Sequence, residues 1–183
     1  MKELLKRLAH LVLGEYSIYQ ILQRSEGQAA IAAPAGAGFR ITPVTRADIE
    51  ASNDPVMREQ AGYAGEGALA YACWHDDQIA GLCFYWHGAR YLPRNFWPLQ
   101  ADEAKLVQVI TSPRMRGRKV AGTLIALSCA DVMTHGFKRT FARVWHSNTP
   151  SLRAFAGAGW TRCAMVIEIN PFRQARPWRL RLP

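Results

Sequence analysis

Residues 105–122 read KLVQVITSPRMRGRKVAG and combine a strand, a basic turn and the start of a helix. Lys105–Thr111 predicts a strand that Ser112-Pro113 ends, and a helix is expected from Gly117 to about His135. The first amides of a helix have no partner within it, and the helix dipole adds partial positive charge there. Four cations surround these donors: Arg114, Arg116, Arg118 and Lys119. The unit is suited to holding phosphate, although a solvated basic turn would have the same composition.

The chain on either side of this unit predicts further strands and short helices. Thr45 can cap a helix that continues through Asp48, Ile49 and Glu50, and Asp76-Asp77 joins two apolar arms into a hairpin. Gly136 is placed to end the long helix. The expected strands are 39–44, 68–75, 78–87, 140–146 and 160–170, the further helices are 56–60 and 147–156, and the inner stripe of the long helix is Val120, Leu124, Leu127 and Met133.

The N-terminal residues 2–24 predict one long or two short helices, because apolar residues recur at helical spacing. That stripe comprises Leu4, Leu8, Leu11, Val12, Tyr19 and Leu22. Packing on the core or on a second subunit would explain it, and contact of residues 2–24 with an anionic membrane surface is the alternative. Residues 25–38, rich in Gly, Ala and Pro, predict a linker. The expected organisation is a helical extension and linker over 1–37, one domain over 38–172 and a basic tail over 173–183.

Chain length, net charge and cysteine spacing limit the classes of protein to which this chain can belong. A chain of 183 residues corresponds to one ordinary domain, and its net charge of +9 favours anionic partners without choosing among them. Cys73, Cys83, Cys129 and Cys163 form no metal-binding spacing, so no metal is expected, and we expect all four to be reduced although Cys73 and Cys83 could face each other in the hairpin. No apolar run reaches the length of a membrane span, which favours a cytoplasmic protein.

Residues 113–122 resemble the pyrophosphate loop of the GNAT (GCN5-related N-acetyltransferase) superfamily, whose pattern is Gln/Arg-x-x-Gly-x-Gly/Ala. Arg116 takes the first place of the pattern and Ala121 the last. Lys119 stands where the middle Gly is usual, and a Cβ there alters how closely the backbone can approach phosphate. The resemblance implies that the main chain of Val109, Ile110 and Thr111 orients a thioester, and that the loop and the helix start hold acetyl-CoA through Arg116, Gly117, Arg118, Lys119, Val120, Ala121, Gly122 and Thr123.

Residues 148–160 resemble the second GNAT signature, an Asn, a helix, and a Gly followed by an aromatic residue. By this resemblance Asn148 would bind the pantetheine arm, Ser151 would lie beside it, and Gly159-Trp160 would lead into the last strand. Phe155 stands beside the carrier where many members have a Tyr that protonates the leaving thiolate. The resemblance covers roughly the last three-quarters of the chain, and it implies an α/β (α+β) fold with a central mixed, mostly antiparallel twisted sheet flanked by helices.

The family resemblance also implies direct acetyl transfer to a primary amine, with acetyl-CoA as co-substrate and no covalent intermediate. A base must then take the amine proton. Glu103 at the start of the strand is one candidate, and His146 is another; His87 can also titrate near neutrality. For each of these side chains, the alternative to catalysis is an ordinary structural or surface role.

The acceptor is left open between several classes. Tyr85, Tyr91 and Trp97 are candidates for lining its pocket, although most aromatic residues on strands belong to a core. We expect a small-molecule amine, with an amino sugar as one example, and a protein N-terminus or lysine as the alternative. A CoA-binding domain without catalysis and a basic nucleic-acid-binding module are two other classes; no nucleic-acid motif supports specific binding. The sequence is compatible with a monomer or a homodimer.

Overall fold

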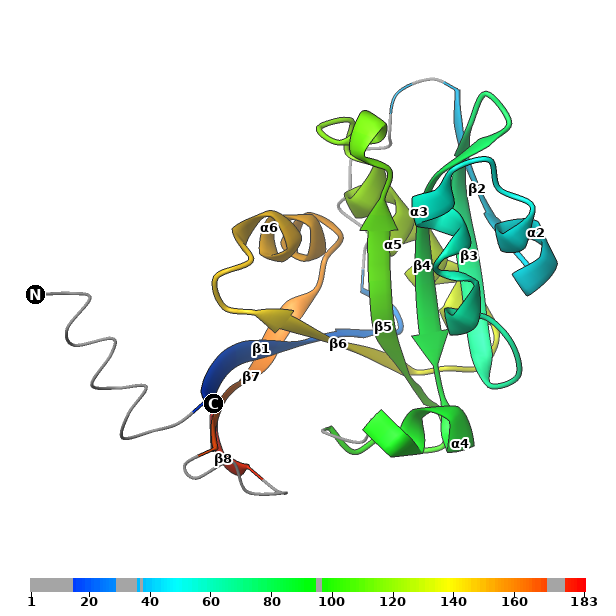
Figure 1. The fold of residues 1–183 in the computed structure, drawn as a ribbon. Helices are drawn as coiled ribbons and strands as arrows, with labels where there is room; N and C mark the ends of the chain where they lie inside the picture. The colour runs from blue at the N-terminus through cyan, green and yellow to red at the C-terminus, as the bar shows by residue number, and fades with distance from the viewer. Residues whose placement is uncertain (1–14, 29–35, 37, 95–96, 171–176) are drawn as a thin grey trace, which may run out of the picture.

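A single eight-stranded sheet forms the centre of the molecule, in the order β2-β3-β4-β5-β6-β1-β7-β8. The computed structural model describes residues 15–28, 36, 38–94, 97–170 and 177–183 (Figure 1). All neighbouring strands are antiparallel except β5 and β6, so the predicted mixed, mostly antiparallel sheet is confirmed. The strands are β1 Glu15–Ser25, β2 Phe39–Pro43, β3 Ala68–His75, β4 Gln78–Trp86, β5 Glu103–Thr111, β6 Arg139–Trp145, β7 Thr161–Asn170 and β8 Trp178–Leu182.

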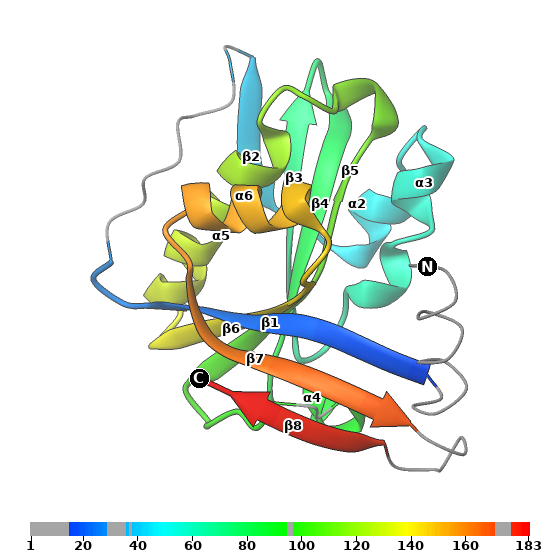
Figure 2. The same ribbon diagram turned by 90° about the vertical axis from the view of Figure 1, so that its left-hand side faces the viewer.

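Helices cover both faces of the sheet. The helices are α2 Arg46–Glu50, α3 Pro55–Arg58, α4 Gly88–Tyr91, α5 Val120–Thr134 and α6 Thr149–Gly157. Helices α5 and α6 lie together on one face, where α5 carries Leu124, Ile125 and Cys129 into the largest core (Figures 1 and 2). Ile49 of α2 and Met57 of α3 pack on the other face. We call these the α5 face and the α2 face.

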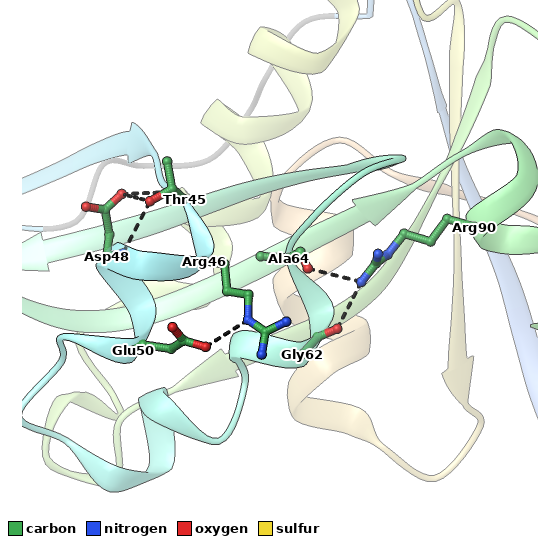
Figure 3. A network of polar contacts seen from close by, with 7 residues as sticks. All are labelled: Thr45, Arg46, Asp48, Glu50, Gly62, Ala64 and Arg90. Carbon is green, nitrogen blue, oxygen red and sulfur yellow. Dashed lines mark hydrogen bonds and ion pairs between the residues drawn. The ribbon is translucent and has the colours of Figure 1, made fainter.

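Local sequence signals explain the first half of the fold. Thr45 forms a capping box with Asp48, whose carboxylate accepts from the Thr45 N–H at 2.7 Å (Figure 3). Asp76 and Asp77 both have left-handed φ, at 48° and 55°, as a two-residue hairpin turn requires. Arg90 of α4 donates to the carbonyl oxygens of Gly62 and Ala64 (Figure 3). It also donates to the Glu66 carbonyl oxygen, and together these bonds fix the segment between α3 and β3. The predicted cap and hairpin are confirmed.

The inner stripe of α5 differs in part from the prediction. Val120 and Leu124 are fully buried, but Leu127 is 51% exposed. The buried side follows Leu124, Ser128 and Val132, spaced by four residues, so Leu127 points outward. Gly136 has φ of +89° after the helix, in agreement with its predicted role as cap.

The predicted helix over residues 2–24 is wrong for residues 15–24, which belong to β1; residues 2–14 lie outside the described residues. β1 lies between β6 and β7, so strand partners supply the hydrogen bonds of its backbone on both sides. Tyr19 and Ile21 pack on the α2 face and Leu22 on the α5 face. Because both faces are buried, β1 lacks the alternation that marks a half-exposed strand. Of the predicted linker, residues 29–35 and 37 lie outside the described part.

The basic tail also contains a strand. Trp178–Leu182 forms β8 and pairs with β7 from Ile169↔Trp178 to Met165↔Leu182. Its sequence WRLRL alternates apolar and cationic residues, the pattern of a strand with two different faces. The sheet therefore extends beyond the predicted domain boundaries of 38–172 at both ends.

Candidate active site

The two parallel strands of the sheet separate partway along their length. β5 and β6 pair from Glu103↔Arg139 to Leu106↔Ala142, and the pairing ends there. Beyond that point β5 continues on β4 and β6 continues on β1. β5 also has a bulge, because Leu106 pairs with Tyr85 and Gln108 with Phe84, leaving Val107 as the extra residue. Val109, Ile110 and Thr111 therefore lie beyond the last residue of β5 that pairs with β6, where the two strands diverge; we call this place the opening.

The turn after β5 brings cations to the start of α5. Pro113–Met115 forms a short 3₁₀ turn, and Gly117 follows with φ of +80°. The N–H of Thr123 donates to the Lys119 carbonyl at 3.1 Å, so the helical ladder begins after the amides of Val120, Ala121 and Gly122. The side chains around these amides are exposed: Arg114, Arg116, Arg118 and Lys119. The observed arrangement fits a diphosphate by both its donors and its charge.

Lys119 has the backbone conformation that favours glycine. Its φ is +61° and its ψ is 12°, in the left-handed region, and it is the N-cap residue of α5. No side-chain cap bond forms at this helix start. Lys119 therefore has a backbone conformation that glycine adopts readily, and it adds a charge beside the first turn.

Asp54 holds the turn in place. The Ser112 hydroxyl donates to Asp54 at 2.9 Å, while the other oxygen of Asp54 caps α3. A cavity of about 570 Å³ lies beside this contact, between the α2–α3 segment and residues 112–115. Its carboxylates, Asp48, Asp54 and Asp77, disfavour a phosphate ligand, and each is already bound within the chain. The helix start therefore fits a diphosphate better than this cavity does.

The residues of the second motif follow β6. Asn148 is the N-cap of α6, and its side-chain oxygen accepts from the Ser151 N–H at 3.2 Å. This bond leaves the two amide protons of Asn148 as donors. Gly122 of α5 faces the Ala154 carbonyl of α6, where an added Cβ would come to 3.9 Å. Phe155 is buried against Trp160 and, like any Phe, has no proton to give.

The candidate bases lie at different ends of the opening. Glu103 is 2% exposed, forms an ion pair with Arg139 and accepts from the Gln100 N–H, all at the paired end of β5 and β6. His146 follows β6 at the open end and is exposed. Its Nδ1 lies 3.1 Å from the Ile18 carbonyl oxygen, which can only accept, so the neutral ring keeps its proton on Nδ1 and a lone pair on Nε2. His87 packs against Phe137, and burial lowers its pKa. The geometry favours His146 over Glu103.

The three candidate acceptor residues do not lie together. Tyr85 is fully buried on the α5 face, 3.0 Å from the Ser128 hydroxyl, so it lines no pocket and this prediction is wrong. Tyr91 and Trp97 lie on the opposite face of the sheet. Trp97 packs on Phe141 with ring centres 5.7 Å apart, and burial raises the pKa of Tyr91 to about 12.

Sequence reasoning missed two cations at the point where the strands separate. Lys105 is 1% exposed, and burial together with the charge of Arg143 places its pKa well below the usual lysine value. Arg143 directly follows Ala142, the last paired residue of β6. A cation within an apolar strand sequence was the available signal for both residues.

Among the described residues no group of three or more His, Cys, Asp or Glu side chains is placed to hold a metal ion. No helix in the described part of the chain is long and apolar enough to cross a membrane.

Solved structures resemble the fold over most of the chain. A GNAT-family acetyltransferase from Colwellia psychrerythraea matches with a TM-score of 0.60 and 14% identity, over 90% of this chain and 60% of that one. A GCN5-related N-acetyltransferase from Sphaerobacter thermophilus gives 0.60 and 13%, over 95% and 57%. A tandem GNAT protein from the clavulanic acid biosynthesis pathway gives 0.53 and 13%, over 92% and 58%. The chain thus spans about three-fifths of the length of these structures, and no curated protein matches it.

The family model described as Acetyltransferase (GNAT) family matches residues 17–160. This range begins within β1 and includes the separation of β5 and β6, the basic turn and the α6 motif. Residues 17–160 are more than half of the chain. The chain therefore belongs to the GNAT acetyltransferase family.

Proposed function

We propose that this protein transfers an acetyl group from acetyl-CoA directly to the primary amine of a small molecule. The observation that carries the proposal is the separation of β5 and β6 after Leu106↔Ala142, beside the cationic start of α5. An opening of this kind admits an extended acyl carrier, and the helix start binds the carrier's phosphates. The cytoplasm is the compartment in which we expect this reaction.

The main chain and the basic turn supply most of the binding. The amides of Val120, Ala121 and Gly122 donate to the diphosphate, and Arg116 and Arg118 add charge. The donor protons of Asn148 are placed for the amide-rich arm of the carrier. Main-chain groups of β5 between Val107 and Thr111 orient the thioester and stabilise the negative charge that develops on its oxygen.

Transfer then needs only proximity and proton removal. The acceptor nitrogen attacks the thioester carbon, the carbon–sulfur bond breaks, and the nitrogen loses one proton while the sulfur leaves as thiolate. Holding both reactants in reach of each other can supply roughly 7–11 kcal/mol. His146 is our candidate to accept the proton at Nε2, directly or through water. Because Phe155 carries no proton, the thiolate is released or protonated by water.

Binding of the carrier is the first test. Acetyl-CoA at about 100 times its Kd should stabilise the fold by about 2.7 kcal/mol, and ATP at the same concentration should stabilise it less. Replacing Arg116 and Arg118 with Gln should raise the Kd about tenfold, because two charges are lost at the phosphates. Arg46→Gln is the matched control, since Arg46 pairs with Glu50 on the surface of α2. If the double variant and Arg46→Gln bind acetyl-CoA with equal Kd values, the two arginines of the turn do not hold the phosphates.

Catalysis is tested separately by thiol release from acetyl-CoA with a panel of primary amines. Direct transfer predicts release that depends on the amine, and no acetyl adduct on the protein by intact mass when the amine is left out. His146→Gln should lower kcat. Binding of acetyl-CoA without release by any amine would favour a CoA-binding domain that does not catalyse, and acetylation of peptides alone would favour a protein acceptor.

A further inference from the structure

The α2 face of the sheet carries a group of arginines on its last four strands. Arg143 of β6 pairs in register with Ile21, whose side chain belongs to the core on this face. Arg179 of β8 pairs with Glu168 of β7, and Arg181 pairs with Val166 of the same core. Figure 2 shows β1, β7 and β8 side by side. Because paired residues point to the same side of a sheet, Arg143, Arg179 and Arg181 share this face. We call them the arginine group.

On the last four strands the charge of this face is predominantly positive. All three arginines are exposed. Among the described side chains of β6, β1, β7 and β8, the one carboxylate is Glu168. It already accepts from Arg179 at 2.7 Å and from the Tyr19 hydroxyl at 3.4 Å. The guanidinium charges therefore outnumber the described carboxylates, which attracts anions to this surface.

Aromatic rings hold two of these guanidinium groups in place. The Arg143 guanidinium lies 5.0 Å from the centre of the Tyr19 ring and 6.0 Å from the centre of the Trp145 ring. The Arg181 guanidinium lies 4.3 Å from the centre of the Trp97 ring. Tyr19 is 1% exposed and Trp97 is half-buried, so the rings are fixed by the core. Arginines stacked on fixed rings lose less entropy on binding a ligand than free surface side chains do.

Arg143 lies where the reaction would take place. It is the first residue of β6 beyond the pairing with β5, so its backbone borders the opening. Helices α5 and α6 occupy the other face, and the proposed carrier enters from their side. An acceptor must then approach the thioester from the α2 face. Arg143 is the cation of the arginine group that such an acceptor meets at the opening.

We propose that the acceptor is an acidic amine, a molecule whose carboxylate or phosphate is bound by Arg143, with Arg179 and Arg181 attracting it. This inference rests on the proposed acetyl transfer. A guanidinium can donate two parallel hydrogen bonds to two oxygens of such a group, which fixes the distance between the acid and the amine. The amine then lies at the opening while the acid remains on the arginine group. Simple cationic amines are poor acceptors because this face repels them.

The test uses pairs of amines that differ by one acidic group. Glucosamine 6-phosphate is compared with glucosamine, and tyrosine with tyramine, by thiol release from acetyl-CoA at low and high salt. The first pair reports a phosphate and the second a carboxylate. We expect the acidic member of at least one pair to have a kcat/KM about tenfold higher, and this advantage to shrink at high salt.

Variants connect the preference to the arginine group. Arg143→Gln should reduce the advantage of the acidic amine in kcat/KM over its partner without the acidic group about tenfold. Arg143→Lys, which keeps the charge and the stem over Tyr19, should recover part of the loss. Arg46→Gln removes an equal charge on the surface of α2, outside the arginine group, and should have no effect. Melting temperatures identify a variant that fails to fold.

Failure of this inference can be told apart from failure of the proposed function. If acetyl-CoA does not stabilise the protein, acetyl transfer itself is refuted. If acetyl-CoA binds and the amines without an acidic group react as well as the acidic ones, or Arg143→Gln and Arg46→Gln behave alike, the acidic acceptor is refuted alone. If acetyl-CoA binds and none of the four amines reacts, the CoA-loaded protein is titrated with the acidic amines by calorimetry. Binding that is lost in Arg143→Gln supports the inference. Absence of binding overturns it.

Discussion

Gly81 of β4 lies against the carbonyl oxygen of Ile110 in β5, and a Cβ on Gly81 would come within 2.8 Å of that oxygen. The same Cβ would lie 3.1 Å from a methyl group of Val120, the first residue of α5. The absence of a side chain at this position thus lets β4, the end of β5 and the start of α5 meet. The opening and the helix start are fixed relative to one another by this contact.

Gly81→Ala should therefore destabilise the fold by about 1–3 kcal/mol, because backbone cannot yield as a flexible side chain does. The shift of α5 should also weaken acetyl-CoA binding. Urea unfolding and acetyl-CoA titration measure the two effects. Gly62→Ala is the control, since nothing lies within 4 Å of its Cβ position. Equal unfolding midpoints for the two variants would show that the contact relaxes without cost.

Lys119→Gly should stabilise the fold by up to about 1 kcal/mol relative to Lys119→Ala, because φ of +61° suits glycine and strains any residue with a Cβ. Both variants lose the same charge, so a difference in their acetyl-CoA affinity reports the backbone alone. Thermal unfolding and titration are the measurements. A more stable Ala variant would contradict the strain assigned to this residue.

Arg24→Met should destabilise the protein by about 2–4 kcal/mol. Arg24 is 4% exposed and donates to the carbonyl oxygens of Ala126 in α5, Ala158 after α6, and Gln28. Its removal leaves buried carbonyls without their donor and loosens both helices from β1. Arg162→Met, on the exposed surface of β7, is the control for urea unfolding. Equal unfolding free energies would mean that water replaces the guanidinium.

Lys105→Met should stabilise the protein at neutral pH. The pKa of Lys105 is lowered in the folded chain, so the unfolded chain binds its proton more tightly. The resulting loss of stability is complete below the folded pKa and is relieved as the pH rises through that value toward the ordinary lysine pKa of about 10.4. The advantage of the variant should shrink as the pH rises. Comparing the two proteins at each pH cancels the titration of Tyr and Cys groups that both contain.

Unfolding in urea at neutral and alkaline pH measures this difference. A gain of about 1 kcal/mol would raise the melting temperature by roughly 2–4 °C in a chain of this size. Lys138→Met is the matched control, because Lys138 is exposed and pairs with Asp102 on the surface. A less stable Lys105→Met at neutral pH would mean that the buried ammonium is compensated by its surroundings.

Local signals in the sequence determined most of the elements from β2 to β7. The Thr45 cap, the Asp76-Asp77 turn and Gly136 each act through neighbours in the chain, so they could be read from the sequence. β1 could not, because its bonding partners are distant: Arg24 binds Ala158 at a separation of 134 residues. Its bulge between Ile21 and Leu22 further disrupts the alternation.

The candidate site, like the fold, could be predicted only where its residues are neighbours in the chain. The basic turn and the helix start are continuous in sequence, and the structure brings them together as expected. Which residues share the α2 face depends on strand register, so Tyr85 was wrongly expected in the acceptor pocket and Arg143 was missed. Register across distant strands is set by the whole sheet and leaves no trace in a short segment.

The central position of β1 has a consequence for synthesis on the ribosome. This strand is made early, yet the atoms that complete it come much later, since the His146 amide that bonds Ile18 lies 128 residues further along. Until β6 and β7 emerge, the backbone of β1 has no strand partner and its apolar side chains are exposed to water. This state favours aggregation or binding by chaperones. Folding of the half of the sheet that contains β6, β1 and β7 must therefore wait until nearly the whole domain has left the exit tunnel.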